Sequence, residues 1–210
     1  SVRWQFITVG SASMDVQGIE DVNGRQAYHI VTKADSAPFF DNFFKVRDVN
    51  ESWMDTESLC SLKYARHIAE GGYRCNETVS LDHENRRYKI EESGQTGDIP
   101  QWVKDVLSSM YYLRTRNLEL GKDYYIDAHA SDKAWPLKVA VVRREKVKTP
   151  AGEFNCLVVI PSLREGAGIF QAKGGLSIWL TDDERKIPVK MESSIAVGSI
   201  EARLVEMKLK

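Results

Sequence analysis

Four histidines are the side chains best suited to acid–base catalysis near neutral pH, and their spacing leaves each of them isolated. His29, His67, His83 and His129 form no pair at the i, i+2 or i+4 spacing that local zinc sites use. The sequence also lacks the Gly-x-Ser-x-Gly turn of a serine nucleophile and the glycine-rich loops that bind phosphate. We therefore predict no catalytic residue, no metal site and no cofactor, and we favour a non-enzymatic protein over an enzyme.

One group of carboxylates leaves a hydrolase open as an alternative. Asp48, Glu51 and Asp55 surround Trp53, and carboxylates beside an aromatic ring are suited to sugar chemistry. Such chemistry needs two carboxylates about 5–9 Å apart across a cleft. A calcium site is not indicated, because the Asp-x-Asp-x-Asp-Gly loop is missing.

The most unusual local feature is a run of four phenylalanines, Phe39, Phe40, Phe43 and Phe44. Phe39 and Phe43 are four residues apart, as are Phe40 and Phe44, so a single helical turn would bring the four rings together. We favour a plug in the core of a sheet; the functional alternative is an apolar mouth that binds a lipid or another hydrophobic ligand. On that alternative the candidate ligand-binding residues are Phe39, Phe40, Phe43, Phe44, Trp102, Tyr111 and Tyr112.

One segment, about 99–114, has the pattern of a long amphipathic helix. Asp98 is placed to cap it and Pro100 fits the first turn. We expect this helix to cover the apolar face of a sheet with a single stripe of side chains. The stripe consists of Ile99, Trp102, Val103, Val106, Leu107 and Met110.

Elsewhere the apolar residues alternate with polar ones, which is the pattern of strands. Leu176–Leu180 and Ile187–Met191 read as one hairpin, with Pro188 expected at an edge or a bulge. Lys138–Lys148 and Glu153–Ile160 read as a second hairpin across a Thr-Pro-Ala-Gly turn. We predict a mainly β fold: a curved antiparallel sheet forming a roll or open barrel, with the helix packed on it.

Composition excludes several classes of protein. Of 210 residues, 42% are hydrophobic and 28% charged, and 29 Lys and Arg balance 30 Asp and Glu. A nucleic-acid-binding protein usually has a basic surplus, and a transmembrane helix needs about 20 apolar residues in succession. Neither feature is present. We expect one β-rich domain over residues 1–210, with a soft division near 91–98.

The three cysteines match neither a disulfide framework nor a metal site. Cys60 and Cys75 would pair only if their strands lay side by side, and we favour buried free thiols for them and for Cys156. The chain begins at Ser1 with neither an initiator Met nor a signal peptide, so we expect it to be processed or truncated.

An ordered series of segments resembles the bacterial family called domain of unknown function 3108. Single segments are weakly diagnostic, but together they span nearly the whole chain in the expected order. They are Phe43–Asp48, Asp55–Leu59, Glu70–Tyr73, Asp105–Arg114, Thr149–Phe154 and Trp179–Val189.

The resemblance implies an exported protein with a β-rich roll or open barrel, held in the periplasm of a Gram-negative-type bacterium. The family has no established activity, so no catalytic residue is transferred to this chain. We expect a non-enzymatic binding or scaffold domain of the cell envelope, whose partner is an unknown envelope component or a hydrophobic small molecule. The alternatives are a carrier of lipid or lipoprotein acyl chains and an envelope hydrolase.

Overall fold

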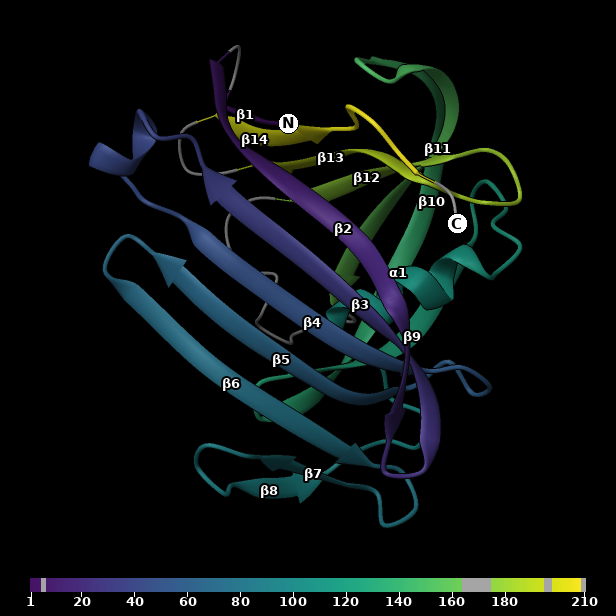
Figure 1. The fold of residues 1–210 in the computed structure, drawn as a ribbon. Helices are drawn as coiled ribbons and strands as arrows, with labels where there is room; N and C mark the ends of the chain where they lie inside the picture. The colour runs from purple at the N-terminus through teal and green to yellow at the C-terminus, as the bar shows by residue number, and fades with distance from the viewer. Residues whose placement is uncertain (5–6, 164–174, 195–197, 209–210) are drawn as a thin grey trace. The chain divides into compact units, whose positions relative to one another are not determined.

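The computed structural model describes residues 1–4, 7–163, 175–194 and 198–208. They form a mainly β structure with one α-helix, which confirms the predicted fold class (Figure 1). The strands are β1 (Val2–Trp4), β2 (Ile7–Val22), β3 (Arg25–Ser36), β4 (Arg47–Asp55), β5 (Ser61–Glu70), β6 (Tyr73–Asp82), β7 (Arg87–Ile90), β8 (Thr96–Asp98), β9 (Asp123–Ala130), β10 (Lys133–Thr149), β11 (Gly152–Leu163), β12 (Leu176–Thr181), β13 (Pro188–Ser194) and β14 (Ser199–Arg203). Their hydrogen-bonded order is β8-β7-β6-β5-β4-β3-β2-β1-β14-β13-β12-β11-β10-β9.

Contacts group the described residues into two compact units. Unit 1 comprises residues 1–11, 114–125 and 137–210, and unit 2 comprises residues 12–113 and 126–136, each with the gaps given above. The single-domain organisation expected from the sequence stays a prediction.

Unit 1 contains both predicted hairpins. β10 pairs with β11 across the turn that joins Thr149 to Gly152, and β12 pairs with β13. The β12–β13 register shifts where Leu180 meets Pro188, so the bulge expected at this proline is confirmed. The core of this unit contains Val147, Cys156, Val158, Trp179, Ile187 and Val189.

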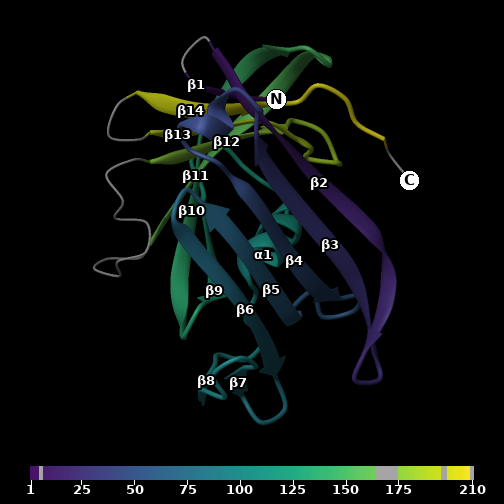
Figure 2. The same cartoon turned by 60° about the vertical axis from the view of Figure 1, so that its left-hand side comes forward.

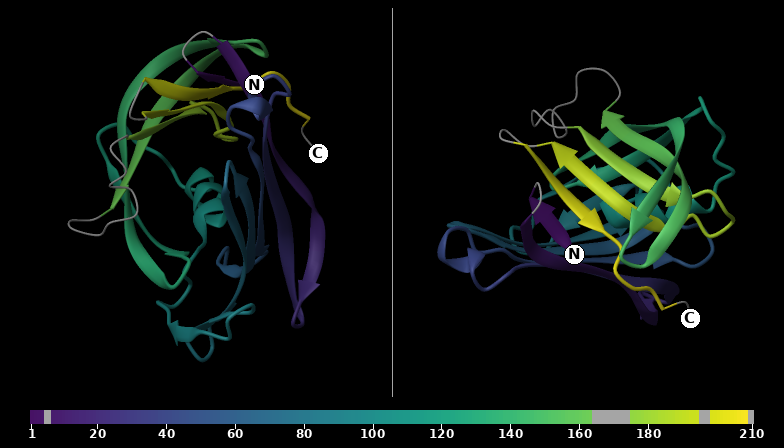
Figure 3. Two further views of the ribbon diagram at one scale, coloured as in Figure 1. Left: turned by 90° about the vertical axis from the view of Figure 1, so that its left-hand side faces the viewer. Right: turned by 90° about the horizontal axis from the view of Figure 1, so that it is seen from above.

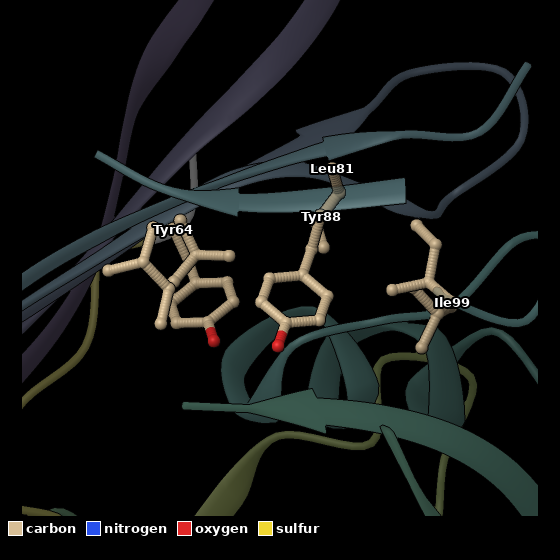
Figure 4. Close-up of a cluster of buried hydrophobic side chains, with 7 residues drawn as sticks. Tyr64, Leu81, Tyr88 and Ile99 are labelled. Carbon is tan, nitrogen blue, oxygen red and sulfur yellow. The ribbon is translucent and has the colours of Figure 1, made fainter. Parts of the chain in front are cut away.

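Unit 2 is built around a meander in which β3, β4, β5 and β6 pair in chain order. Figure 2 shows these long strands side by side. A hydrophobic cluster on one face includes Tyr64, Leu81, Tyr88 and Ile99 (Figure 4). The three cysteines are free thiols, and Cys60 and Cys156 are buried.

The helix is shorter than predicted and turns a different face to the sheet. It spans α1 (Val106–Arg114), because Asp105 caps it in place of Asp98. Residues before Asp105 cannot continue the helix, since Trp102 has a left-handed backbone (φ 62°) and Lys104 bridges to Ala128.

The predicted apolar stripe is therefore only partly right. Ile99 and Val103 are buried, but Trp102 and Val106 are 45% and 57% exposed. The buried residues of the helix itself are Ser108, Ser109 and Leu113. In Figure 3, left, α1 lies beside one face of the unit 2 strands. Two of the three buried residues of the helix are serines, so its buried side is largely polar.

Candidate functional site

A buried hydrogen-bond network joins α1 to the centre of β4. The Asp105 carboxylate accepts bonds from the backbone N–H groups of Leu107 (2.7 Å) and Ser108 (3.1 Å). It also accepts bonds from the hydroxyls of Ser52 (2.5 Å) and Ser108 (2.9 Å). Both serines are fully buried, so this carboxylate satisfies donors that have no access to water.

A second buried polar group lies on the same side of the sheet. The Tyr64 hydroxyl is 2.9 Å from Nδ1 of His129, whose ring lies 4.6 Å from that of Tyr88. Figure 4 shows both phenol rings standing on one side of the sheet, with their hydroxyls directed away from it. Burial lowers the pKa of His129 to about 4 and raises that of Tyr64. His129 is therefore neutral at pH 7.

His83 and Lys104 form a third polar group, beside Trp102. His83 Nε2 donates to the Ser61 carbonyl (2.7 Å), and among the described residues its buried Nδ1 has no partner. The Trp102 ring stacks on the His83 ring, with their centroids 5.8 Å apart. The backbone carbonyl of Trp102 accepts from Lys104 Nζ at 2.8 Å. Burial lowers the pKa of His83 and of Lys104. The left-handed backbone of Trp102 is the one strained feature of this group.

His29 binds two carboxylates on neighbouring strands. Its Nδ1 is 2.8 Å from Glu20 of β2, and its Nε2 is 2.7 Å from Glu51 of β4. Its ring stacks on Trp53 at 4.5 Å, and Trp53 donates to the same Glu20. The Trp53 hydrogen bond, followed by His29, lowers the pKa of Glu20. Both ring nitrogens of His29, both carboxylate oxygens of Glu20 and the indole N–H of Trp53 have structural partners, so this group holds β2, β3 and β4 together.

The carboxylates considered for a hydrolase do not converge. Asp48 accepts from the backbone N–H of Ala69, and Asp55 pairs with Arg25 at 2.9 Å. Asp48 and Asp55 are seven residue steps apart along one strand, which is roughly 23 Å. Glu51 is engaged by His29. The arrangement does not provide the paired carboxylates that glycoside hydrolysis needs.

The phenylalanine run is exposed, and the core plug favoured from the sequence is wrong. The short 3-10 helix η1 (Phe40–Asn42) projects these rings from the β3–β4 connection. Phe39, Phe43 and Phe44 are 69%, 76% and 56% exposed. Phe39 packs edge-on against Phe40 at 5.2 Å and contacts Phe43 at 5.8 Å. We call the exposed rings of Phe39, Phe43 and Phe44 the aromatic tip.

The backbone under the aromatic tip is fixed by polar groups. Ser36 donates to Asp41 (2.5 Å) and accepts from the backbone N–H of Val46 (2.8 Å). Arg47 pairs with Asp41 at 2.6 Å. The hydrogen bond from Ser36, followed by that from Arg47, lowers the pKa of Asp41. These bonds tie both ends of the loop together, so the apolar rings are held outward.

The Phe44 ring packs against Gly71 in the β5–β6 turn. This glycine has φ +53°, and a Cβ built there would lie 2.7 Å from the Phe44 ring. We expect Gly71→Ala to lower the free energy of unfolding by about 1–2 kcal/mol, because alanine disfavours the left-handed region and the ring must move. Urea denaturation measures this loss. Gly72→Ala in the same turn has no atom within 4 Å of the new Cβ and is the control; an equal loss there would contradict the assignment.

The structure does not bring the predicted ligand-binding residues into one site. The aromatic tip lies just before Arg47, the first residue of β4. Trp102 lies near the other end of β4, because the carbonyl of its neighbour Val103 accepts from the backbone N–H of Ser61, which is opposite the end of β4. The length of β4 separates the two groups by roughly 25 Å. Tyr112 lies under Lys104 Nζ at 4.2 Å, and Tyr111 is half-buried.

Two features are missing from the part of the chain that the structure describes. Among those residues, no group of three or more His, Cys, Asp or Glu side chains is placed to bind a metal ion. No helix within the same residues has the length and apolarity to span a membrane.

Comparisons with known proteins place the chain in a family. A β-barrel-like protein of domain of unknown function DUF1849 from Brucella abortus aligns over 94% of each chain, with a TM-score of 0.60 and 10% identity. A Bacteroides fragilis protein with a YmcC-like fold, whose description refers to export, covers 95% of this chain and 94% of its own, with a TM-score of 0.32 and 15% identity. No curated protein sequence matches. The first likeness concerns the fold alone.

The family match is more specific than either structural likeness, because it rests on the sequence itself, whereas the two structures share only 10% and 15% sequence identity with this chain. The family model covers residues 1–205, which include every segment that carried the resemblance. The chain belongs to DUF3108, a protein family of unknown function.

Proposed function

We propose that this protein is a non-enzymatic binding domain of the bacterial cell envelope, acting in the periplasm, and that the aromatic tip is its contact with acyl chains. The observation that carries the proposal is the exposure of three phenylalanines on one anchored loop. Exposed rings clustered at one place mark an interaction surface far more often than scattered apolar residues do.

Lipid is the partner that the tip suits best. Phenyl rings at the end of a rigid loop insert into the boundary between head groups and acyl chains without unfolding the loop. Charges of both signs lie near the tip. Lys45 follows Phe44 in the chain and Arg74 donates to the carbonyl of Gly71, which lies against the Phe44 ring, whereas Glu70 bridges to Val46. Apolar contact is therefore expected to dominate over attraction to anionic head groups.

We expect replacement of the tip to abolish lipid binding while the fold survives. Phe39→Ser/Phe43→Ser/Phe44→Ser should weaken binding to phosphatidylethanolamine–phosphatidylglycerol vesicles by at least about tenfold, because each ring contributes apolar burial. Flotation of the full chain with vesicles measures this change. Ile19→Ser, which removes a 57% exposed apolar side chain from β2, is the matched control and should bind as wild type.

A second arm of the same experiment distinguishes binding of single acyl chains from binding of a lipid surface. Monomeric dodecanoate competes with vesicles if the tip captures single chains, as a carrier would, and fails to compete if the tip needs a lipid surface. Wild-type protein that binds neither probe, or a triple variant that binds as wild type, would overturn the proposal. Localisation to the periplasm is tested separately, by fractionating cells that express the native gene.

A further inference from the structure

The outer edge of β6 is open over part of its length. β6 pairs with β5 from Tyr73 to Ser80, but β7 covers its other side only from Val79 to Asp82. Figure 1 shows β6 as the outermost long strand of unit 2, with β7 and β8 beside its C-terminal end only. The described residues leave the other side of the N-terminal half of β6 without a pairing strand.

The direction of the backbone groups on this edge follows from the pairing. Successive residues of an antiparallel strand direct their N–H and C=O groups to alternate sides. Thr78 directs both groups outward, since its N–H bonds Glu92 (2.8 Å) and its C=O accepts from Glu91 (2.9 Å). Arg74 and Asn76 have the same parity, so they present the open backbone groups of the edge.

We propose that this edge pairs antiparallel with the β6 edge of a second copy of the chain. Open backbone groups on an edge strand are a ready template for another strand. We favour a second copy as the occupant, because the charges on this edge and the covered C-terminal end of β6 allow two copies to pair in a single register.

Three twofold registers bring Arg74 or Asn76 of one copy opposite Arg74 or Asn76 of the other, and two of them are unfavourable. Placing Arg74 opposite Arg74 of the second copy sets like charges face to face. Placing Asn76 opposite Asn76 requires Thr78 to bond across the interface, but Glu91 and Glu92 already occupy its backbone groups.

In the remaining register, Arg74 of one copy lies opposite Asn76 of the other, and Cys75 lies opposite Cys75. Residues 75 then form a non-hydrogen-bonded pair with Cα atoms about 4.5 Å apart. That separation is within the range of about 4.4–6.8 Å that a disulfide can bridge. Tyr73, which is 60% exposed, lies opposite Glu77 of the second copy and becomes covered.

Cysteine cross-linking of the full chain with oxidised glutathione tests the register. One Cys75 thiolate displaces glutathione from the disulfide, and Cys75 of the second copy then displaces the second glutathione. Two protein thiols are oxidised and one glutathione disulfide becomes two thiols. We expect a covalent dimer from wild type and none from Cys75→Ser, because Cys60 and Cys156 are buried.

Two further sets of variants distinguish cross-links that form through edge pairing from cross-links that form by random collision. Arg74→Pro removes an outward N–H without touching the β5–β6 bonds and should lose the dimer, whereas Arg74→Ala keeps the backbone and the dimer. In the Cys75→Ser background, a mixture of Arg74→Cys and Asn76→Cys chains should cross-link, and either chain alone should not.

The result that overturns the proposal is equally specific. Wild-type protein that stays monomeric in sedimentation equilibrium and forms no cross-link would do so, as would an Arg74→Pro dimer equal to that of wild type. If that variant does not fold, cross-linking of Arg74→Cys alone as fast as in the mixture has the same consequence. Dimerisation is measured without lipid, so its failure leaves the acyl-binding proposal to its own test.

Discussion

Replacement of Asp105 by alanine is expected to lower the free energy of unfolding by about 3–5 kcal/mol. The variant loses the cap of α1 and strands the fully buried hydroxyls of Ser52 and Ser108. Asp105→Asn retains one carbonyl oxygen for the cap and an amide that the serines can accept from, so it should lose only about 1 kcal/mol. Urea denaturation followed by far-ultraviolet circular dichroism measures both changes.

Asp98→Ala is the control for this prediction, because the sequence pattern assigned the cap to that residue. In the structure the Asp98 side chain is 87% exposed and pairs with Arg87 on the surface at 3.2 Å. Its removal should change the free energy of unfolding by less than about 1 kcal/mol. A larger loss at Asp98 than at Asp105 would restore the longer helix and contradict the structure described above.

Acid is expected to destabilise the protein through His129, beginning below about pH 6.5. Burial lowers the pKa of His129 from 6.5 to about 4, so in this range the unfolded chain binds a proton that the folded chain does not. The stabilising neutral form is fully present above the unfolded pKa and is lost as the pH falls. The contribution of this residue to the free energy of unfolding should fall by about 3 kcal/mol between pH 7 and pH 4.

Urea denaturation at a series of pH values measures that slope. The double variant Tyr64→Phe/His129→Phe removes the titrating ring and its hydroxyl partner together, and its profile should be flatter over the same range. His67→Gln, at an exposed position of β5, should retain the wild-type slope. His83 has a pKa lowered in the same direction, so adding His83→Gln to the double variant is expected to flatten the profile further. An unchanged slope in the double variant would show that His129 is not buried in its neutral form.

The sheet was predictable because its information is local. Alternation of apolar residues, the Pro150–Gly152 turn and the bulge at Pro188 all act within one hairpin, so neighbouring residues suffice to identify them. The start of the helix was not predictable from neighbouring residues, although Asp98 and Pro100 form a sound capping pattern. It depends on the pairing of Lys104 with Ala128 and on the contact of Asp105 with Ser52, both of which join distant parts of the chain.

The phenylalanine run illustrates a different limit. Apolar side chains at helical spacing are usually buried, and nothing in the residues themselves indicates that Phe39 and Phe43 face water. The anchoring of the loop by Ser36, Asp41 and Arg47 exposes them, and the five residues between Asp41 and Arg47 gave no motif that predicts this bond. The buried contacts of Ser52 and His129 were likewise missed, because their partners lie 53 and 65 residues away in sequence.

The role of the aromatic tip is tested most directly by a probe placed on it. In a Cys75→Ser background, Cys60 and Cys156 are buried, so a polarity-sensitive fluorophore can be attached selectively at Phe43→Cys or at Ile19→Cys. Adding phosphatidylethanolamine–phosphatidylglycerol vesicles should shift the emission of the probe at 43 to shorter wavelength and leave that at 19 unchanged. No shift at residue 43, or an equal shift at both positions, would contradict the proposal that this protein contacts acyl chains through its aromatic tip.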